Sequence, residues 1–353
     1  MLRKGTFILM KTKIQDMTSG SPGRLIILFA IPLMLGNICQ QLYTMVDTMV
    51  VGQVAGVEAL AALGAVDFLM WVVTGISTGL TQGFSIQLSQ YYGAKDFENL
   101  RKSLAHSYRL TAFIAAGVFI LSQSFASLVL TGLHTPSNII GMSLLYLRII
   151  FCGIPATAAY NMFASALRAM GNSKTPLTAM IIASVLNVSL DLLFVAGFGW
   201  GVAGAAIATV IAQSFSAVYC FLILRRIDIV HLTRADFMPA SGMNARLMKL
   251  GIPVVFQNII IGVGGLVVQY VINGYGFLFV AGFTATNKLY GLLEMAAISY
   301  GYAIVTYVGQ NLGAGKIDRI RKGVRSSMLL SLLTSLIISA AMFLFGKNIL
   351  SLF

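Results

Sequence analysis

Long apolar runs separated by short polar connections dominate the pattern of this chain of 353 residues. Because the hydrocarbon core of a bilayer is about 30 Å thick, a spanning helix needs about 20 consecutive, mainly apolar residues. Nine stretches meet that requirement, and each predicts a transmembrane helix. They lie near residues 25–50, 58–85, 107–131, 139–167, 176–198, 202–224, 248–273, 277–308 and 326–346. The pattern therefore predicts an all-α polytopic membrane protein, with the lipid bilayer as its first partner.

Composition agrees with this prediction. Hydrophobic residues make up 58% of the chain and charged residues 10%, and the mean hydropathy is +0.86. Soluble domains carry about 25% charged residues, so a soluble globular protein is excluded.

The Lys and Arg residues occur in alternate connections between the predicted spans. The connections near 51–57, 132–138, 199–201 and 274–276 hold none of them. By the positive-inside rule the N-terminus is then cytoplasmic and the chain lies in the cytoplasmic (inner) membrane. The positive-inside rule therefore explains the net charge of +13, and nucleic-acid binding is not expected.

Two parts of the sequence repeat each other. Pro32 and Pro253 match at an offset of 221 residues, and Gln90 and Gln310 match at an offset of 220 within "LSQYYGAKDFENLRKS" and "VGQNLGAGKIDRIRKG". Six spans separate the copies, so they are parallel repeats of the kind that builds two-lobe transporters. The predicted division is a cytoplasmic N-terminal segment 1–23, a six-helix first lobe 24–224, a cytoplasmic interlobe linker 225–247 and a partial, three-helix second lobe 248–353.

If the second copy mirrors the first, twelve spans are expected. The sequence ends after the ninth, so we expect a fragment or truncated product with an incomplete second lobe rather than a genuine nine-span protein.

Polar residues inside spans are the first candidates for function. Asn187 and Asp191 stand four residues apart and so share one helix face. Span arithmetic places Asp47, Asn187, Asp191 and Thr209 at similar depth in the outer half of the first lobe. Two carboxylates, an amide and a hydroxyl could hold Na⁺ or a proton. The alternative is that each acid makes a capping or interhelix hydrogen bond.

A second group of candidates lies along the inward-running second and eighth spans. Asp67 and Lys288 occupy nearly matching repeat positions near mid-membrane, which suggests an interlobe ion pair or a substrate contact. Glu294 is deeper in the same span as Lys288. Met70, Trp71 and Tyr290 could form an adaptable apolar wall of a substrate cleft, or could simply pack.

Signatures of catalysis are missing from the sequence. No Cys/His cluster has metal-ligand spacing, no GxxxxGK[ST] loop is present, and no Ser/His/Asp set converges. We therefore expect no enzyme, no bound cofactor and no metal beyond a possible Na⁺ at Asp47, Asn187, Asp191 and Thr209. An ion gradient of H⁺ or Na⁺ would supply the energy of a transporter.

Five segments together resemble the MATE family of multidrug and toxic compound extrusion transporters. They are "AIPLMLGNICQQLYTMVDTMVVG", "GLTQGFSIQLSQYYGAKD", "ALRAMGNSKTPL", "NVSLDLLFV" and "GQNLGAGK". The resemblance implies a twelve-helix, two-lobe antiporter that exports organic cations in exchange for H⁺ or Na⁺. It also implies a first-lobe ion site, matched here by Asp47, Asn187, Asp191 and Thr209.

The sequence departs from that family where spans ten to twelve would follow, and the seventh-span segment "IIIGVGGLVVQYVIN" has no acid. The leading prediction is a monomeric antiporter that exports organic cations, drugs or metabolites by alternating access. The alternatives are a flippase for lipid or cell-envelope precursors, and an inactive truncated transporter fragment. Neither the cargo nor the choice between H⁺ and Na⁺ follows from the sequence.

Overall fold

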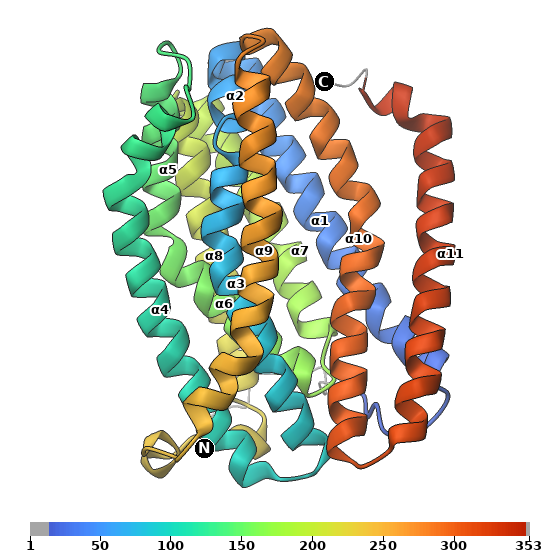
Figure 1. Cartoon of the computed structure of the whole chain (residues 1–353). Helices are drawn as coiled ribbons and strands as arrows, with labels where there is room; N and C mark the ends of the chain where they lie inside the picture. Colours follow the sequence, from blue (N-terminus) through green and yellow to red (C-terminus); the bar gives the residue numbers. More distant parts are fainter. Residues whose placement is uncertain (1–13, 351–353) are drawn as a thin grey trace, which may run out of the picture.

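The computed structural model describes residues 14–350, apart from the side chains of residues 277–278, 281, 284–285, 288–290, 292–293 and 345–350. Its helices run side by side along the long axis of one bundle (Figure 1). We call α1 to α8 the first half of the chain and α9 to α11 the second half.

In the first half, the elements are α1 (Pro22–Ala55), α2 (Val57–Gly64), α3 (Asp67–Gly93), α4 (Phe97–Gly132), α5 (Ile140–Cys152), α6 (Ile154–Ala169), α7 (Lys174–Asp191), the π-helix η1 (Leu192–Gly197) and α8 (Gly201–Leu224). The connection to the second half holds two 3₁₀ turns, η2 (Asp228–Val230) and η3 (Arg234–Phe237). The second half comprises α9 (Met243–Asn273), α10 (Phe277–Gly313) and α11 (Ile317–Leu350).

All nine predicted spans lie on helices, but three of them are interrupted. The second span divides into α2 and α3, and the fifth changes from α-helix to π-helix after Asp191. The fourth bends by 48° between α5 and α6, where Gly153 precedes Pro155 in the first turn of α6. Among the described residues, seven helices are long and apolar enough to cross a membrane, or eight with the bent pair. The remaining predicted span lies on α10.

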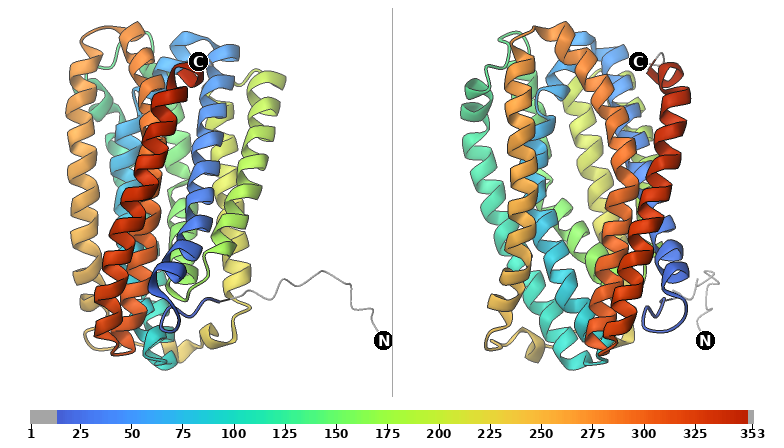
Figure 2. Two further views of the ribbon diagram at one scale, coloured as in Figure 1. Left: turned by 90° about the vertical axis from the view of Figure 1, so that its right-hand side faces the viewer. Right: turned by 45° about the vertical axis from the view of Figure 1, so that its right-hand side comes forward.

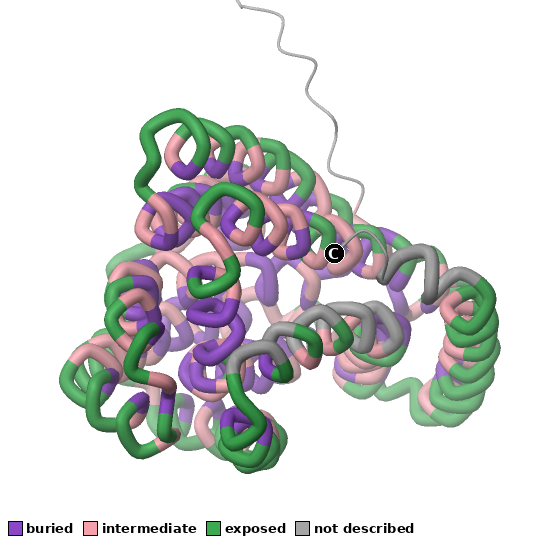
Figure 3. Tube along the Cα trace, turned by 90° about the horizontal axis from the view of Figure 1, so that it is seen from above, coloured by how far each residue is buried: buried purple, intermediate pink, exposed green. Residues whose placement is uncertain are grey.

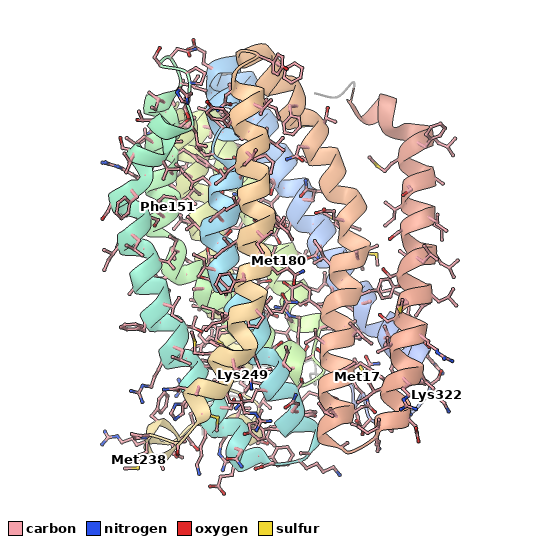
Figure 4. The ribbon with its side chains drawn as sticks, viewed as in Figure 1. Met17, Phe151, Met180, Met238, Lys249 and Lys322 are labelled. Atoms are coloured by element: carbon pink, nitrogen blue, oxygen red, sulfur yellow. The ribbon has the colours of Figure 1, made fainter. Side chains whose placement is uncertain are left out.

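The connections that contain Lys and Arg all lie at one end of the bundle. These are the turns α3–α4, α6–α7 and α10–α11 and the α8–α9 connection, which are at the bottom of Figure 1. Lys249 and Lys322 from two of these regions lie toward the same end in Figure 4. We call this the basic end, and the other the opposite end.

Burial is greatest within the first half. The view down the bundle shows buried residues gathered toward its middle, whereas α11 stands at the edge (Figure 3). On α11 the side chains of Ile337 and Phe343 are 70% and 92% exposed. Apolar side chains on such a surface face lipid at no cost in a bilayer.

The two halves meet mainly where α3 contacts α9 and α10, and the views in Figure 2 place these helices side by side. At the basic end the two repeat copies touch each other. A Cβ atom on Gly93 would clash with the backbone of Gln310, and one on Gly313 would clash with the backbone of Gln90. Glycine is therefore required at both equivalent positions, because each helix end approaches the backbone of the other copy.

Candidate functional site

Three helices of the first half bring the four predicted ion-site residues together. Asp47 of α1 and Asn187 and Asp191 of α7 are buried, and Thr209 of α8 is half-buried. Helix α1 contacts both α7 and α8, and α7 contacts α8. The i, i+4 spacing of Asn187 and Asp191 places both side chains on the face of α7 that meets these neighbours.

The contacts within this group are partly hydrogen-bonded and partly electrostatic. The amide of Asn187 donates its Nδ2 hydrogen to Oγ1 of Thr209 at 3.4 Å. The carboxylates of Asp47 and Asp191 are close enough to interact electrostatically. Two like charges in a buried place repel each other, and a cation or proton between them removes that repulsion.

Several oxygen atoms in this group lack a donor. Both carboxylate oxygens of Asp191 and the amide oxygen of Asn187 are buried without a hydrogen-bond partner among the described atoms. A buried acceptor without a partner costs about 1–3 kcal/mol, more when it is charged. Such acceptors suit a ligand that donates a proton or binds oxygen as a hard cation does. We call Asp47, Asn187, Asp191 and Thr209 the acid cluster.

Sequence reasoning missed three residues beside the acid cluster. Tyr43 stands one turn before Asp47 on α1, and Nε2 of Gln213 donates to its hydroxyl at 3.3 Å. Tyr146 of α5 is buried and interacts electrostatically with both acids. The signal for Tyr43 was present in the sequence, because it lies four residues before Asp47, as Gln213 lies four after Thr209.

A π-helix begins directly after Asp191. Its Phe194 ring stacks on Trp200 with centroids 5.1 Å apart, and a Cβ atom on Gly204 would lie 3.0 Å from that of Phe194. π-Helical turns are rare and often found at functional sites. Here the turn joins the acid cluster to an aromatic group at the opposite end of the bundle.

A cavity of about 490 Å³ lies between the two halves and is separate from the acid cluster. It is lined by one face of α3 and by parts of α9 and α10: Trp71, Thr74, Gly75, Thr78, Gln82, Gln257, Asn258, Ile261, Glu294, Ala297, Ile298, Gly301 and Tyr302. Among these described residues Glu294 is the one carboxylate, and none is Lys or Arg. Its size falls in the usual range of about 300–1,000 Å³ for small-molecule sites.

Two of the predicted cleft residues, Trp71 and Glu294, line this cavity. Met70 does not: it lies about 100° around the helix from Trp71 and packs against an apolar cluster of the first half. Asp67 is the first residue of α3, beyond the cavity lining, and it interacts electrostatically with Tyr146. The break between α2 and α3 explains this placement, since depth counted along one uninterrupted span is then misleading. The side chains of Lys288 and Tyr290 lie outside the described residues.

Comparison with known proteins places the chain in a family. The MatE family model matches residues 32–193 and 253–353, two segments whose starts have the same offset of 221 residues as Pro32 and Pro253. The probable multidrug resistance protein YpnP of Bacillus subtilis is 32% identical over 308 residues, which cover 87% of this chain and 69% of the relative. The probable multidrug resistance protein NorM of Thermotoga maritima is 25% identical over 93% of this chain and 71% of its own length.

Solved structures show the same fold. An outward-facing multidrug resistance MATE family transporter of the MOP superfamily superposes with a TM-score of 0.88 at 23% identity, covering 97% of this chain and 76% of that one. A MOP superfamily transporter from Pyrococcus furiosus gives 0.87 at 23% identity, covering 96% and 75%. The multi-pass helical fold, the family model and the curated relatives agree: the chain belongs to the MATE family, whose members are small-molecule transporters of the membrane and not enzymes.

Proposed function

We propose that this protein exports organic cations, including drugs, across the cytoplasmic membrane by alternating access, in exchange for H⁺ or Na⁺. The cavity between the halves carries the proposal. Glu294 offers a negative charge, and Trp71 offers an aromatic ring that attracts cations; the Tyr302 ring already faces the guanidinium of Arg168, 4.6 Å from its centroid. The amides of Gln82 and Gln257 add polar contacts in a lining without a described positive charge.

The names of the relatives support the class of cargo. YpnP and NorM are both named as probable multidrug resistance proteins, and the MepA protein of Staphylococcus saprophyticus, 22% identical, is named as a multidrug export protein. A flippase for lipid phosphates would need positive charges around its cargo, and the described cavity lining offers none.

Helix α1 is the element through which ion binding would act on the cavity. It carries Asp47 of the acid cluster, and Nδ2 of its Asn37 donates to Oγ of Ser299 on the cavity helix α10 at 3.0 Å. A proton or Na⁺ at Asp47 and Asp191 would neutralise the cluster and allow α1 to repack against α7. Pro32 within α1 removes one backbone hydrogen bond, so bending there costs less than elsewhere. That movement would release the cargo.

In the proposed orientation the basic end faces the cytoplasm, because Lys and Arg are retained on that side and attract the anionic inner leaflet. The N-terminus is then cytoplasmic. We propose a monomer as the working unit.

Replacing Glu294 by Gln tests the proposed function. Loss of the negative charge should weaken binding of tetraphenylphosphonium to the purified protein about tenfold, which corresponds to about 1.4 kcal/mol, and should slow export of a cationic dye from cells. Glu98→Gln is the matched control, since Glu98 pairs with Lys102 at the exposed start of α4 and should change neither. Unchanged binding in Glu294→Gln would show that the cavity does not select cations as proposed.

A further inference from the structure

The segment Gln15–Gly20, which precedes α1, lies across both halves at the basic end. We call it the strap. Its Met17 side chain is fully buried in a cluster with Phe29 of α1 and Tyr307 of α10. A segment that only precedes the first span would not need to bury a side chain between helices of both halves. The burial of Met17 therefore suggests a structural role for the strap.

Side chains of the second half bind the backbone of the strap. Oε1 of Gln310 accepts from the Met17 N–H at 3.0 Å, and Nδ2 of Asn311 donates to the Met17 carbonyl at 2.9 Å. Lys316 donates to the carbonyl of Thr18 at 2.8 Å. Arg319 donates to the carbonyl of Gly20 at 2.8 Å and to that of Met17 at 3.4 Å. The bonds from Lys316 and Arg319 are charge-assisted and therefore stronger than neutral ones.

The first half holds the same strap and the same glutamine. The N–H of Gln15 donates to the carbonyl of Gly171 in the α6–α7 turn at 3.1 Å. Gly171 has φ +89°, and a Cβ atom there would clash with the carbonyl of Gln15. Nε2 of Gln310 donates to the carbonyl of Ala169 at 2.8 Å. The buried amide of Gln310 therefore joins the strap, the first half and the second half.

At the positions equivalent to Lys316 and Arg319, the first copy has different residues with different contacts. Lys316 and Arg319 correspond, at the offset of 220, to Asp96 and Asn99. Asp96 instead caps α4 by accepting from the backbone N–H of Asn99 at 3.1 Å. Lys316 and Arg319 thus belong to the second copy specifically, whereas Gln310 has the same residue, Gln90, at its equivalent position in the first copy.

We propose that the strap is a latch that holds the two halves together at the basic end and is released when the cavity opens toward that end. If the halves separate there, the Gln310–Ala169 bond breaks, and the strap must leave either Gly171 or Arg319. The latch therefore sets the balance between states closed and open at the basic end. It rests on the alternating access of the proposed function.

The test measures access to the cavity from the basic end. Gln82 is the lining residue closest to the basic end of α3, so a Gln82→Cys reporter is placed in a background carrying Cys39→Ser, Cys152→Ser and Cys220→Ser. Inside-out vesicles present the basic end to the medium in the proposed orientation. The labelling rate by a membrane-impermeant maleimide should rise at least threefold with Arg319→Ala. Arg319→Lys, which keeps the charge but has one donor group, should lie between.

Arg321→Ala is the matched control, because Arg321 is exposed on the same turn of α11 and makes no hydrogen bond or ion pair with the strap among the described residues. Lys316→Ala is a milder second variant that loses the bond to Thr18 and should raise labelling about twofold. Unchanged labelling in both Arg319→Ala and Lys316→Ala, or an equal rise in Arg321→Ala, overturns the latch. Dye export by the unmodified chain is scored separately, so failure of the transport proposal is distinguishable from failure of the latch.

Discussion

The acid cluster and the strap are both polar regions within an apolar bundle, but they differ in hydrogen bonding: buried acceptors of the acid cluster lack donors, whereas those of the strap have them. Around Asp191 both carboxylate oxygens are buried without a donor among the described atoms. In the strap, the carbonyl of Met17 receives hydrogen bonds from both Asn311 and Arg319. Unsatisfied buried acceptors are costly and persist where a ligand uses them, whereas satisfied ones stabilise a single arrangement. From this difference we expect the acid cluster to bind a proton or cation and the strap to keep one fixed arrangement.

The largest expected effect comes from replacing Asp191 by Asn in the acid cluster. The amide keeps the shape but cannot take up a proton or balance Na⁺, so export of a cationic dye should fall more than tenfold while the protein still folds. Dye efflux from cells expressing the full chain is the measurement.

Ser189→Ala on the same helix is the matched control, because Ser189 is exposed and donates only to the backbone carbonyl of Val185. Export at the original rate in Asp191→Asn would show that the acid cluster takes no part in transport.

An intermediate effect, on the stability of the protein, is expected at the α8–α9 connection, which also lies at the basic end. The α8–α9 connection precedes α9 as the strap precedes α1, and His106 of α4 contacts the carbonyl of Met238 at 3.0 Å and Oδ1 of Asn244 at 2.7 Å. His106→Ala removes both contacts, and because Met238 and Asn244 belong to the exposed surface, each lost hydrogen bond should cost about 0.5–1.5 kcal/mol of stability. Thermal unfolding of the purified protein measures this loss.

The exposed His231 is the control, since it makes only a long pair with Asp228 at 3.8 Å. His231→Ala should unfold at the temperature of the unmodified chain. An equal drop in both variants would mean that His106 does not hold the connection in a specific way.

The smallest effect concerns pH and the strap. Burial alone would raise the pKa of Asp16, but the N–H and hydroxyl of Thr18, the hydroxyl of Ser19 and nearby Lys316 together lower this pKa from its ordinary value of 3.8. A lowered pKa in the folded state stabilises the strap at neutral pH, and this contribution is lost only as pH falls through the lowered value.

The amide resonance of Thr18 in an NMR titration should therefore stay constant from about pH 8 to pH 5 and move with a midpoint below 3.8. A midpoint above that value would contradict the hydrogen bonds assigned to Asp16. Asp16→Asn should remove the transition.

Local patterns predicted more of this molecule than long-range contacts did. Hydropathy placed every span on a helix, and the i, i+4 rule placed Asn187 and Asp191 together, because both depend on neighbours in the chain. The hydrogen bond between Met17 and Gln310 joins residues 293 positions apart, and no periodicity carries such information. The break between α2 and α3 was missed for a related reason, since an apolar run reads the same whether its helix continues or restarts.

The glycine contacts between α3 and α10 have a consequence for how the two copies can diverge. Gly93 is required by the backbone of the second copy and Gly313 by that of the first. Neither position can accept a larger side chain unless the backbone of the other copy moves, so each repeat copy restricts the sequence of the other. The short stretch in which the duplication is most readable is thus the stretch in which the duplicates touch.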